Sequence, residues 1–468
     1  MIDRISELFS PVQTQSSDEV AAASILSELG LLQLLESLNA CNEQAQLHRL
    51  CTYIERISDT RLGAAKLAEA VAFVEGGVTR EDPRVRLLTA RLLGATASVV
   101  ANSETCQPLI ALLGDADSDV SAAAARSLLR LQHEVLLQPR ALPSAANDSS
   151  AVVRLRAMDV AARLASKSEA GRAAVQASGV FHGLIRDISN QNDALVALAS
   201  CEVLAELVES QETAAGIAAV LSEALPALAR LVRDDSTETL LRQRCLILLG
   251  RIASSAQGVV AVFLDLALYC MSQHMGLQEA AMQACGCLSE SMHGAESMLL
   301  APRLASAVCE AALRRPGSDA AVLAEMHTLA TAAGAERPVD AELFSDEAER
   351  ALEDACRQAT NLATSLWAHL QRQGDAFVEG RIAAYRLMSA LGRRRWAAAN
   401  VCSHAALLAH MCGSESGHRA NTWRIAAVGA LISGLRHVTD AQATLLPRLE
   451  AATRIAPQRS AEPQVATL

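Results

Sequence analysis

The chain has 468 residues, of which 41 are Lys or Arg and 52 are Asp or Glu, so its formal net charge is -11. Hydrophobic residues make up 51% but aromatic residues only 3%, which excludes a disordered chain and argues against a β-sandwich or barrel, whose strands favour aromatic and β-branched side chains. The acidic balance also argues against a general nucleic-acid binder, which needs Lys and Arg to displace counterions.

The ends and the apolar segments indicate a soluble protein. The N-terminal segment carries Asp3 and Glu7 and lacks the apolar stretch of a signal peptide. The longest apolar stretch, residues 258–271, contains Asp265 and is shorter than the ~18 residues of a membrane span. Twelve cysteines are scattered through helical-looking segments, as packed, reduced thiols would be. We therefore expect a cytoplasmic protein, with the nucleus as a second location, and no membrane partner.

The first part of the chain is predicted to consist of capping helices. Within residues 1–75, apolar residues recur at helical spacing over 31–38 and again over 47–62. Neither run has the composition of the segments that follow. We expect this N-terminal part to cover one end of a repeat array, because terminal units of such arrays need a polar outer face.

Residues 76–315 contain six copies of one pattern, a polar turn followed by an apolar helix. The first large aliphatic residues of the copies, here called the anchors, are Val85, Val120, Val153, Val196, Leu241 and Leu277. Their intervals of 35, 33, 43, 45 and 36 residues bracket the ~40-residue period of armadillo and HEAT repeats. After Leu241 the apolar residues fall at i+4, i+7, i+8 and i+11, which makes one helical stripe.

A second helix precedes several of the anchors. It is predicted to start at Pro108 in one copy and at Pro226 in another, because proline is favoured in the first turn of a helix. Such helix pairs bury their apolar faces only by stacking on neighbouring pairs. The sequence thus predicts an all-α fold, an armadillo/HEAT-type α-solenoid that forms a right-handed superhelix of stacked helical repeats.

The repeat phase is lost after residue 315. Pro316, Gly317, Gly334 and Pro338 punctuate residues 316–345, which we predict to be an irregular or hinge segment. Helical repeats are expected to resume over 346–455. Residues 456–468 are expected to form a disordered tail.

One segment near the C-terminus invites a metal hypothesis. It contains five soft ligands, Cys402, His404, His410, Cys412 and His418. Two pairs of them are eight residues apart, roughly 80° around a helix, whereas helical zinc sites use i and i+4, and a CxxC knuckle is absent. We favour buried thiols on a helix and a turn.

Other signs of chemistry are weak. Cys285 lies on an apolar stripe and is expected to be a small core residue, with a redox role as the minor alternative. The sequence contains neither a Gly-rich phosphate loop nor a GxSxG elbow. We therefore expect no enzyme activity, no cofactor and no metal.

Arg393, Arg394 and Arg395 form a basic run before Trp396. We expect a solvated turn between two helices. Contact with an acidic partner is the alternative interpretation.

Two positions of each repeat are predicted to face a concave groove. They lie six and ten residues after the anchor, so they are four apart on one helix face. We call these positions the ladder, and its candidate partner-binding residues are Arg91, Arg126, Arg130, Asp159, Arg163, Glu202, Glu206, Arg251, Gln283 and Arg386, the last from a unit at 379–400.

The charges of the ladder limit what it can bind. The ladder has neither the Trp nor the Asn with which import receptors grip basic peptides, and its N-terminal arginines would repel such a peptide. Basic positions followed by two acidic ones favour a folded partner with complementary patches. The alternative is that these residues are simply solvated helix faces.

Several segments, in chain order, resemble one protein family. They are LGLLQLLESLN from Leu29, GGVTREDPRVRLLTARLLG from Gly76, VVRLRAMDVAARLASKSEAG from Val152 and EGRIAAYRLMSALGRRRWAAAN from Glu379. Together they resemble the 26S proteasome non-ATPase regulatory subunit 5 family. Residues 254–370 match poorly, and this chain is richer in Ala than the animal members.

The resemblance implies a function. It implies an assembly chaperone of the base of the proteasome regulatory particle, which binds the C-terminal domain of an AAA+ ATPase subunit and delays docking onto the core particle. A large non-ATPase base subunit is a second expected partner, and nucleic acid is not one. We expect a monomer when the chain is free. The alternative is a generic armadillo scaffold or transport adaptor that binds another protein.

Overall fold

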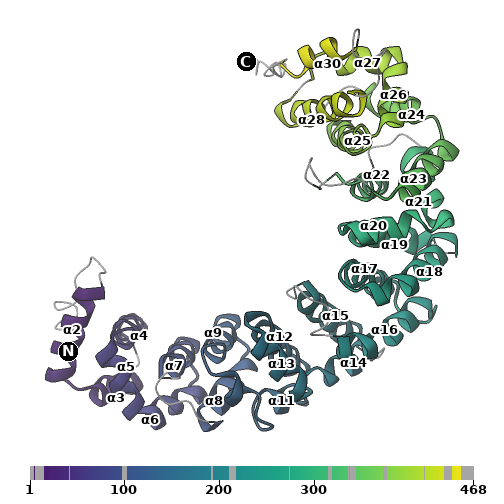
Figure 1. The fold of residues 1–468 in the computed structure, drawn as a ribbon. Coiled ribbons are helices and arrows are strands. Elements are labelled where there is room, and N and C mark those ends of the chain that lie inside the picture. The colour runs from purple at the N-terminus through teal and green to yellow at the C-terminus, as the bar shows by residue number, and fades with distance from the viewer. Residues whose placement is uncertain are drawn as a thin grey trace, which may run out of the picture. The chain divides into compact units, whose positions relative to one another are not determined.

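A computed structural model of the chain describes most of its residues. The described residues are 5, 15–41, 43–96, 103–190, 193–209, 218–273, 275–314, 319–335, 337, 344–372, 377–415, 417–436 and 445–454. Every regular element among them is a helix (Figure 1). The predicted all-α solenoid is therefore confirmed, whereas its superhelical hand stays a prediction. The predicted tail at 456–468 lies outside the described residues.

The chain divides into two compact units, Met1–Glu223 and Ala224–Leu468. The boundary lies inside the predicted repeat region, and no signal in the sequence marked it. The first unit contains α2 (Gln15–Glu28), α3 (Leu31–Ala40), α4 (Gln44–Ser58), α5 (Arg61–Glu69), α6 (Val71–Glu75), the 3₁₀ helix η1 (Gly76–Thr79), α7 (Pro83–Thr96), α8 (Ser103–Leu113), α9 (Ser118–Leu128), α10 (His133–Leu136), α11 (Leu142–Ala145), α12 (Ala151–Lys167), α13 (Glu169–Ser178), α14 (His182–Ile188) and α15 (Ala194–Glu209).

Helix α16 (Ala218–Arg233) spans the boundary between the units. The second unit continues with α17 (Thr239–Ser255), α18 (Gln257–Gln273), α19 (Met275–Leu288), α20 (Met292–Leu299), α21 (Pro302–Arg314), α22 (Ala320–Ala332), α23 (Asp346–Ala359), α24 (Leu362–Leu370), α25 (Val378–Leu391), α26 (Arg395–Ser403), α27 (Ala405–Met411), α28 (His418–Leu435) and α30 (Leu446–Ala452).

Each unit contains one continuous row of packed helices. In the first unit α4, α7, α9, α12 and α15 pack in that order, and we call them the first stack (Figure 1). In the second unit α17, α19, α22, α25 and α28 pack in order, and we call them the second stack. The remaining helices form a second layer in each unit; in the second unit, for example, α18 packs on α21, and α21 on α23.

The anchors explain why these rows form. The six anchors lie in the first turns of α7, α9, α12, α15, α17 and α19, and all are buried except Val153, which is half-buried. At α9 the carboxylate of Asp117 accepts hydrogen bonds from the backbone N–H groups of Asp119 and Val120, which caps the helix. Glycine allows the closest approach, since a Cβ at Gly250 of α17 would collide with the Ala284 carbonyl of α19.

The predicted helix starts at Pro108 and Pro226 are wrong. Helix α8 begins at Ser103 and α16 at Ala218, so both prolines lie inside helices. An internal proline removes a backbone hydrogen bond and bends the helix. Here buried apolar residues lie on both sides of each proline, Cys106 and Leu109 in α8 and Ala224 and Ala227 in α16. Their burial favours a continuous helix over a break.

Residues 316–345 were predicted to be an irregular or hinge segment, but α22 within them is a regular helix, so the irregular interpretation is wrong there, and the hinge stays a prediction. Asp319 caps this helix by accepting a hydrogen bond from the N–H of Val322 at 2.9 Å. Met326 and Leu329 are buried where α22 packs on α19, α21 and α25. Gly334, at φ +93°, follows the end of the helix. The prolines and glycines of this segment therefore flank a regular helix of the second stack in the sequence.

Among the described residues, no single helix is long and apolar enough to cross a membrane. One pair of segments, Asp18–Glu28 and Leu31–Leu38, reaches that length and composition only together, across an 85° bend.

Candidate partner-binding surface

The first stack brings seven ladder residues onto consecutive helices. Six of them are exposed and Asp159 is half-buried, so most of these side chains are not covered by packing within the unit, while their place in a concave groove stays a prediction. By helix, Arg91 lies on α7, Arg126 and Arg130 on and just after α9, Asp159 and Arg163 on α12, and Glu202 and Glu206 on α15.

Two of the ladder arginines have carboxylate partners within the first unit. Arg91 forms an ion pair with Glu55 of α4, and Arg163 Nε lies 3.1 Å from Asp159 Oδ1 on its own helix. Exposed pairs of this kind add little stability. In the part of the chain that the structure describes, no ion pair engages Arg126 of α9 or Arg130 just after it, so the positive charges of these two exposed side chains are not paired with a carboxylate there.

The second stack places its three ladder residues differently. Gln283 on α19 is exposed and Arg251 on α17 is half-buried. Arg386 on α25 donates from Nη1 to His327 Nδ1 at 2.9 Å and to the His327 carbonyl at 3.0 Å, and from Nη2 to Thr331 Oγ1 at 2.9 Å. Arg386 therefore fastens α25 to α22, and its donors are used inside the protein.

These contacts fix the protonation of His327. A guanidinium can only donate, so Nδ1 of His327 accepts and the ring is neutral with its proton on Nε2. Burial, and next the charge of Arg386, lower the pKa of His327. Burial also lowers the pKa of Arg386.

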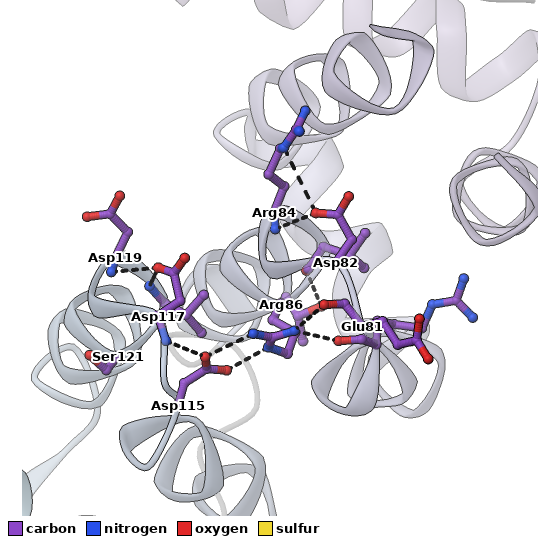
Figure 2. A network of polar contacts seen from close by, with 12 residues as sticks. Glu81, Asp82, Arg84, Arg86, Asp115, Asp117, Asp119 and Ser121 are labelled. Atoms are coloured by element: carbon purple, nitrogen blue, oxygen red, sulfur yellow. Dashed lines mark hydrogen bonds and ion pairs between the residues drawn. The ribbon is translucent and has the colours of Figure 1, made fainter. Parts of the chain in front are cut away.

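Sequence reasoning missed a set of structural ion pairs. We call them clasps: in the two described below, an arginine of a stack helix binds an aspartate of the second layer and two backbone carbonyls. Figure 2 shows the first, in which Arg86 of α7 donates from Nε and Nη2 to the two carboxylate oxygens of Asp115, at 2.6 and 3.0 Å. Its Nη1 donates to the carbonyls of Arg80 and Glu81, both at 2.7 Å. The hydrogen bond from Arg86 is the main cause of the lowered pKa of Asp115. Asp115 also accepts from the N–H of Asp117, the cap of α9, so the clasp ties α7 to the start of the next helix in the stack.

A second clasp repeats this geometry at α12, two members after α7 in the first stack. Arg154 of α12 donates to both oxygens of Asp187 in α14, at 2.8 and 3.3 Å. Its Nη1 donates to the carbonyls of Asp148 and Ser149, at 2.9 and 3.0 Å. Asp187 is only 2% exposed. Its buried charge is compensated by Arg154 and, at 3.5 Å from Oδ1, by Nε of the more exposed Arg186.

The clasps have a signal that could have been read in the sequence. An arginine follows the anchor directly at Arg86, at Arg154 and at Arg242, and Arg242 pairs with Asp235 at 2.9 Å. Each has an aspartate near the end of an adjacent second-layer helix. The clasps therefore tie second-layer segments to helices of the stacks.

Comparison with known proteins shows the family to which the chain belongs. The sequence model of the family described as "Proteasome non-ATPase 26S subunit" matches residues 2–330, which include the whole first stack and both clasps. The chain belongs to this family. No curated protein matches the chain. Among solved structures, the crystal structure of an engineered protein covers 86% of this chain and 98% of its own, with 17% identity and a TM-score of 0.44.

Beyond the matched residues, three of the five candidate metal ligands, Cys402, His404 and His410, lie in buried or hydrogen-bonded positions within the fold. His404 Nδ1 accepts from the N–H of Leu407 at 3.2 Å and caps α27. The Tyr385 hydroxyl donates to Glu415 at 2.5 Å, so His410 Nε2, 2.7 Å away, donates to that hydroxyl. Burial lowers the pKa of His410 and raises that of Cys402 to about 11. Within the described residues no three His, Cys, Asp or Glu side chains are grouped as a metal would require.

The basic run before Trp396 is not a solvated turn throughout. Arg394 is 3% exposed, and its Nε lies 2.8 Å from Glu349 Oε2. Its Nη1 donates to the carbonyls of Ala333 and Ala390, at 3.0 Å each. The guanidinium also lies 5.2 Å from the ring centroid of Phe344. The expectation fails for Arg394 because three helices supply acceptors around it.

Proposed function

We propose that this proteasome-family chain is an assembly chaperone of the base of the regulatory particle. It binds the C-terminal domain of an AAA+ ATPase subunit and delays docking of that subunit onto the core particle. The observation that carries the proposal is the family match over residues 2–330. The all-helical repeat fold supports a protein-binding role, because stacked repeats present long surfaces for partners.

The charges of the first stack support a folded partner. Exposed Arg126 and Arg130 lie on and just after α9, and exposed Glu202 and Glu206 lie on α15 of the same unit. A partner with patches of the opposite signs would be oriented as it docks, and a like-charged partner would be repelled. A surface of ~800 Å² on each side is enough for a specific complex, and a row of five helices can supply it.

The proposed mechanism is steric. While the ATPase domain lies on the stack, the surface it needs for the core particle is covered. Release then follows competition between the core particle and the chaperone for the same domain. The chain acts as a monomer in the cytoplasm, with the nucleus as a second location, and a large non-ATPase base subunit is a second partner.

A pull-down from cell extract at moderate salt, followed by mass spectrometry, tests this function. The expected result is a small set of base ATPases and base non-ATPase subunits without core-particle subunits. Complete, active 26S particles would instead identify a stable subunit. Transport cargo without proteasome proteins would identify a generic scaffold.

A second assay tests the order of events. Purified ATPase C-terminal domain is bound to the chain, and core particle is then titrated into the complex. Competition predicts that core particle displaces the chain from the domain. A stable complex of all three would contradict the steric mechanism while leaving binding itself intact.

A further inference from the structure

Two thiols from different helices meet in the second unit. Cys309 of α21 and Cys356 of α23 have their Sγ atoms 3.8 Å apart, although 47 residues separate them in the chain. Cys309 is 0% and Cys356 1% exposed. Helices α21 and α23 pack side by side over much of their length, so the two sulfur atoms are held in contact by the packing.

A cavity leads to one of the two thiols. Its volume is about 440 Å³, and it is lined by Cys356, Arg357 and Asn361 on one side and by Trp396 and Asn400 of α26 on the other. Cys309 is not among its lining residues. A small polar oxidant that enters this cavity therefore meets Cys356 first.

We propose that Cys309 and Cys356 are a modification site, a thiol pair that a peroxide oxidises to a disulfide between α21 and α23. Cys356 is the thiol that reacts with the peroxide, and Cys309 is the thiol that resolves the product. The proposal is independent of the chaperone function.

The chemistry proceeds in two balanced steps. The Cys356 sulfur attacks one oxygen of hydrogen peroxide; an S–O bond forms, the O–O bond breaks, and the thiol proton leaves with the second oxygen as water. The Cys309 sulfur then attacks the sulfenic sulfur of Cys356. The S–S bond forms, the S–O bond breaks, and the Cys309 proton leaves with hydroxide as a second water. Two thiols are oxidised by two electrons and one peroxide is reduced.

The environment of the pair agrees with this order. A hydrogen bond with Cys356, and next burial, raise the pKa of Cys309 well above its usual range. Cys309 therefore remains protonated and is a poor first nucleophile. Once Cys356 carries a hydroxyl group, its sulfur is an electrophile in contact with Cys309. A disulfide needs the sulfur atoms at ~2.05 Å, so the side chains must turn or the helices must move together slightly.

Peptide mapping of the full-length chain tests the pair. The folded protein is treated with hydrogen peroxide, its remaining thiols are alkylated with N-ethylmaleimide during unfolding, and peptides are analysed without reduction. The expected product is a peptide pair that joins Cys309 to Cys356, has lost two hydrogens and separates on reduction. The oxidised protein should also melt several degrees higher, because the bond constrains the unfolded chain.

Two variants sharpen the test. Cys309→Ser should leave a sulfenic acid on Cys356 that dimedone traps, since nothing resolves it. Cys412→Ser removes a half-buried thiol elsewhere and should leave the cross-link unchanged.

Other products would overturn the proposal. One is recovery of both Cys309 and Cys356 as alkylated thiols while Cys412 is oxidised. Another is a disulfide of Cys356 with a different cysteine. Because the mapping uses the unmodified sequence, these results count even if Cys309→Ser fails to fold.

Discussion

Arg126 in the first stack and Arg386 in the second were assigned the same kind of ladder position, yet they have different roles. Arg126 is exposed, and the described structure shows no ion pair to it. Arg386 is half-buried and donates to His327 and Thr331 of α22. The position within a repeat decides which face of the helix a residue occupies. The neighbouring helix decides whether its charge is left for a partner or used to hold the stack.

The clasps extend the comparison from single residues to layers. Arg154 and Arg163 lie on the same helix, two and a half turns apart. Arg154 ties a buried aspartate of the second layer to α12, whereas Arg163 pairs with an aspartate on its own exposed face. Buried and exposed ion pairs of similar length should therefore contribute very differently to stability.

The largest expected effect tests that contrast. Arg154→Ala removes the two-point partner of buried Asp187 and leaves only the more exposed Arg186, whose Nε lies 3.5 Å from Asp187 Oδ1. It should lower the free energy of unfolding by about 3 kcal/mol, the lower end of the range for breaking a buried ion pair. Arg163→Ala, on the same helix, should change it by less than about 1 kcal/mol. Urea unfolding followed by circular dichroism measures both. Equal losses would show that the clasp contributes no more than a surface pair.

The next effect concerns binding. Reversing both charges of α9, with Arg126→Glu and Arg130→Glu together, should weaken binding of the ATPase C-terminal domain by about tenfold or more without lowering the melting temperature. The control is Arg140→Glu with Arg303→Glu, which changes the charge equally at exposed positions outside the two stacks. Titration calorimetry measures binding. A parallel fall in melting temperature would mean that the α9 arginines are structural.

Arg386 should show the opposite behaviour. Arg386→Ala removes three hydrogen bonds between α25 and α22 and should cost about 1–3 kcal/mol of stability. Binding of the ATPase domain, measured below the melting temperature, should be unchanged. Weaker binding with unchanged stability would instead show that Arg386 contacts the partner. Arg386 and Arg126 would then have the same role in the two stacks.

The smallest effect is a dependence on pH. Burial lowers the pKa of His327 and His410 in the folded chain, below 6.5, so the unfolded chain binds protons first as the pH falls. Stability should thus be fully present above about pH 6.5 and decrease below it, by at most about 1.4 kcal/mol per pH unit for each imidazole. Thermal melts between pH 7.5 and 5.5 measure this. His327→Gln should reduce the slope of stability against pH, whereas the exposed control His48→Gln should leave it unchanged. Identical slopes for both variants would exclude His327 as a source of the pH dependence.

The sequence alone determined the helical repeats and the exposed face of the first stack. Anchor spacing and the apolar stripe are local properties, since a helix places i and i+4 on one side whatever lies around it. The anchors accordingly lie in the first turns of α7, α9, α12, α15, α17 and α19. Six of the seven ladder residues of the first stack are exposed. Local signals failed where burial outweighed them, as at Pro226 inside α16 and in α22.

Only the tertiary structure decided which charged and sulfur-bearing side chains meet. Arg86 and Asp115 are 29 residues apart, Cys309 and Cys356 are 47, and Arg386 and His327 are 59. Whether such residues touch depends on how closely adjacent helices stack and on their relative rotation. Those quantities come from packing between helices, for example at Gly250 against Ala284, and no periodicity within one helix contains them.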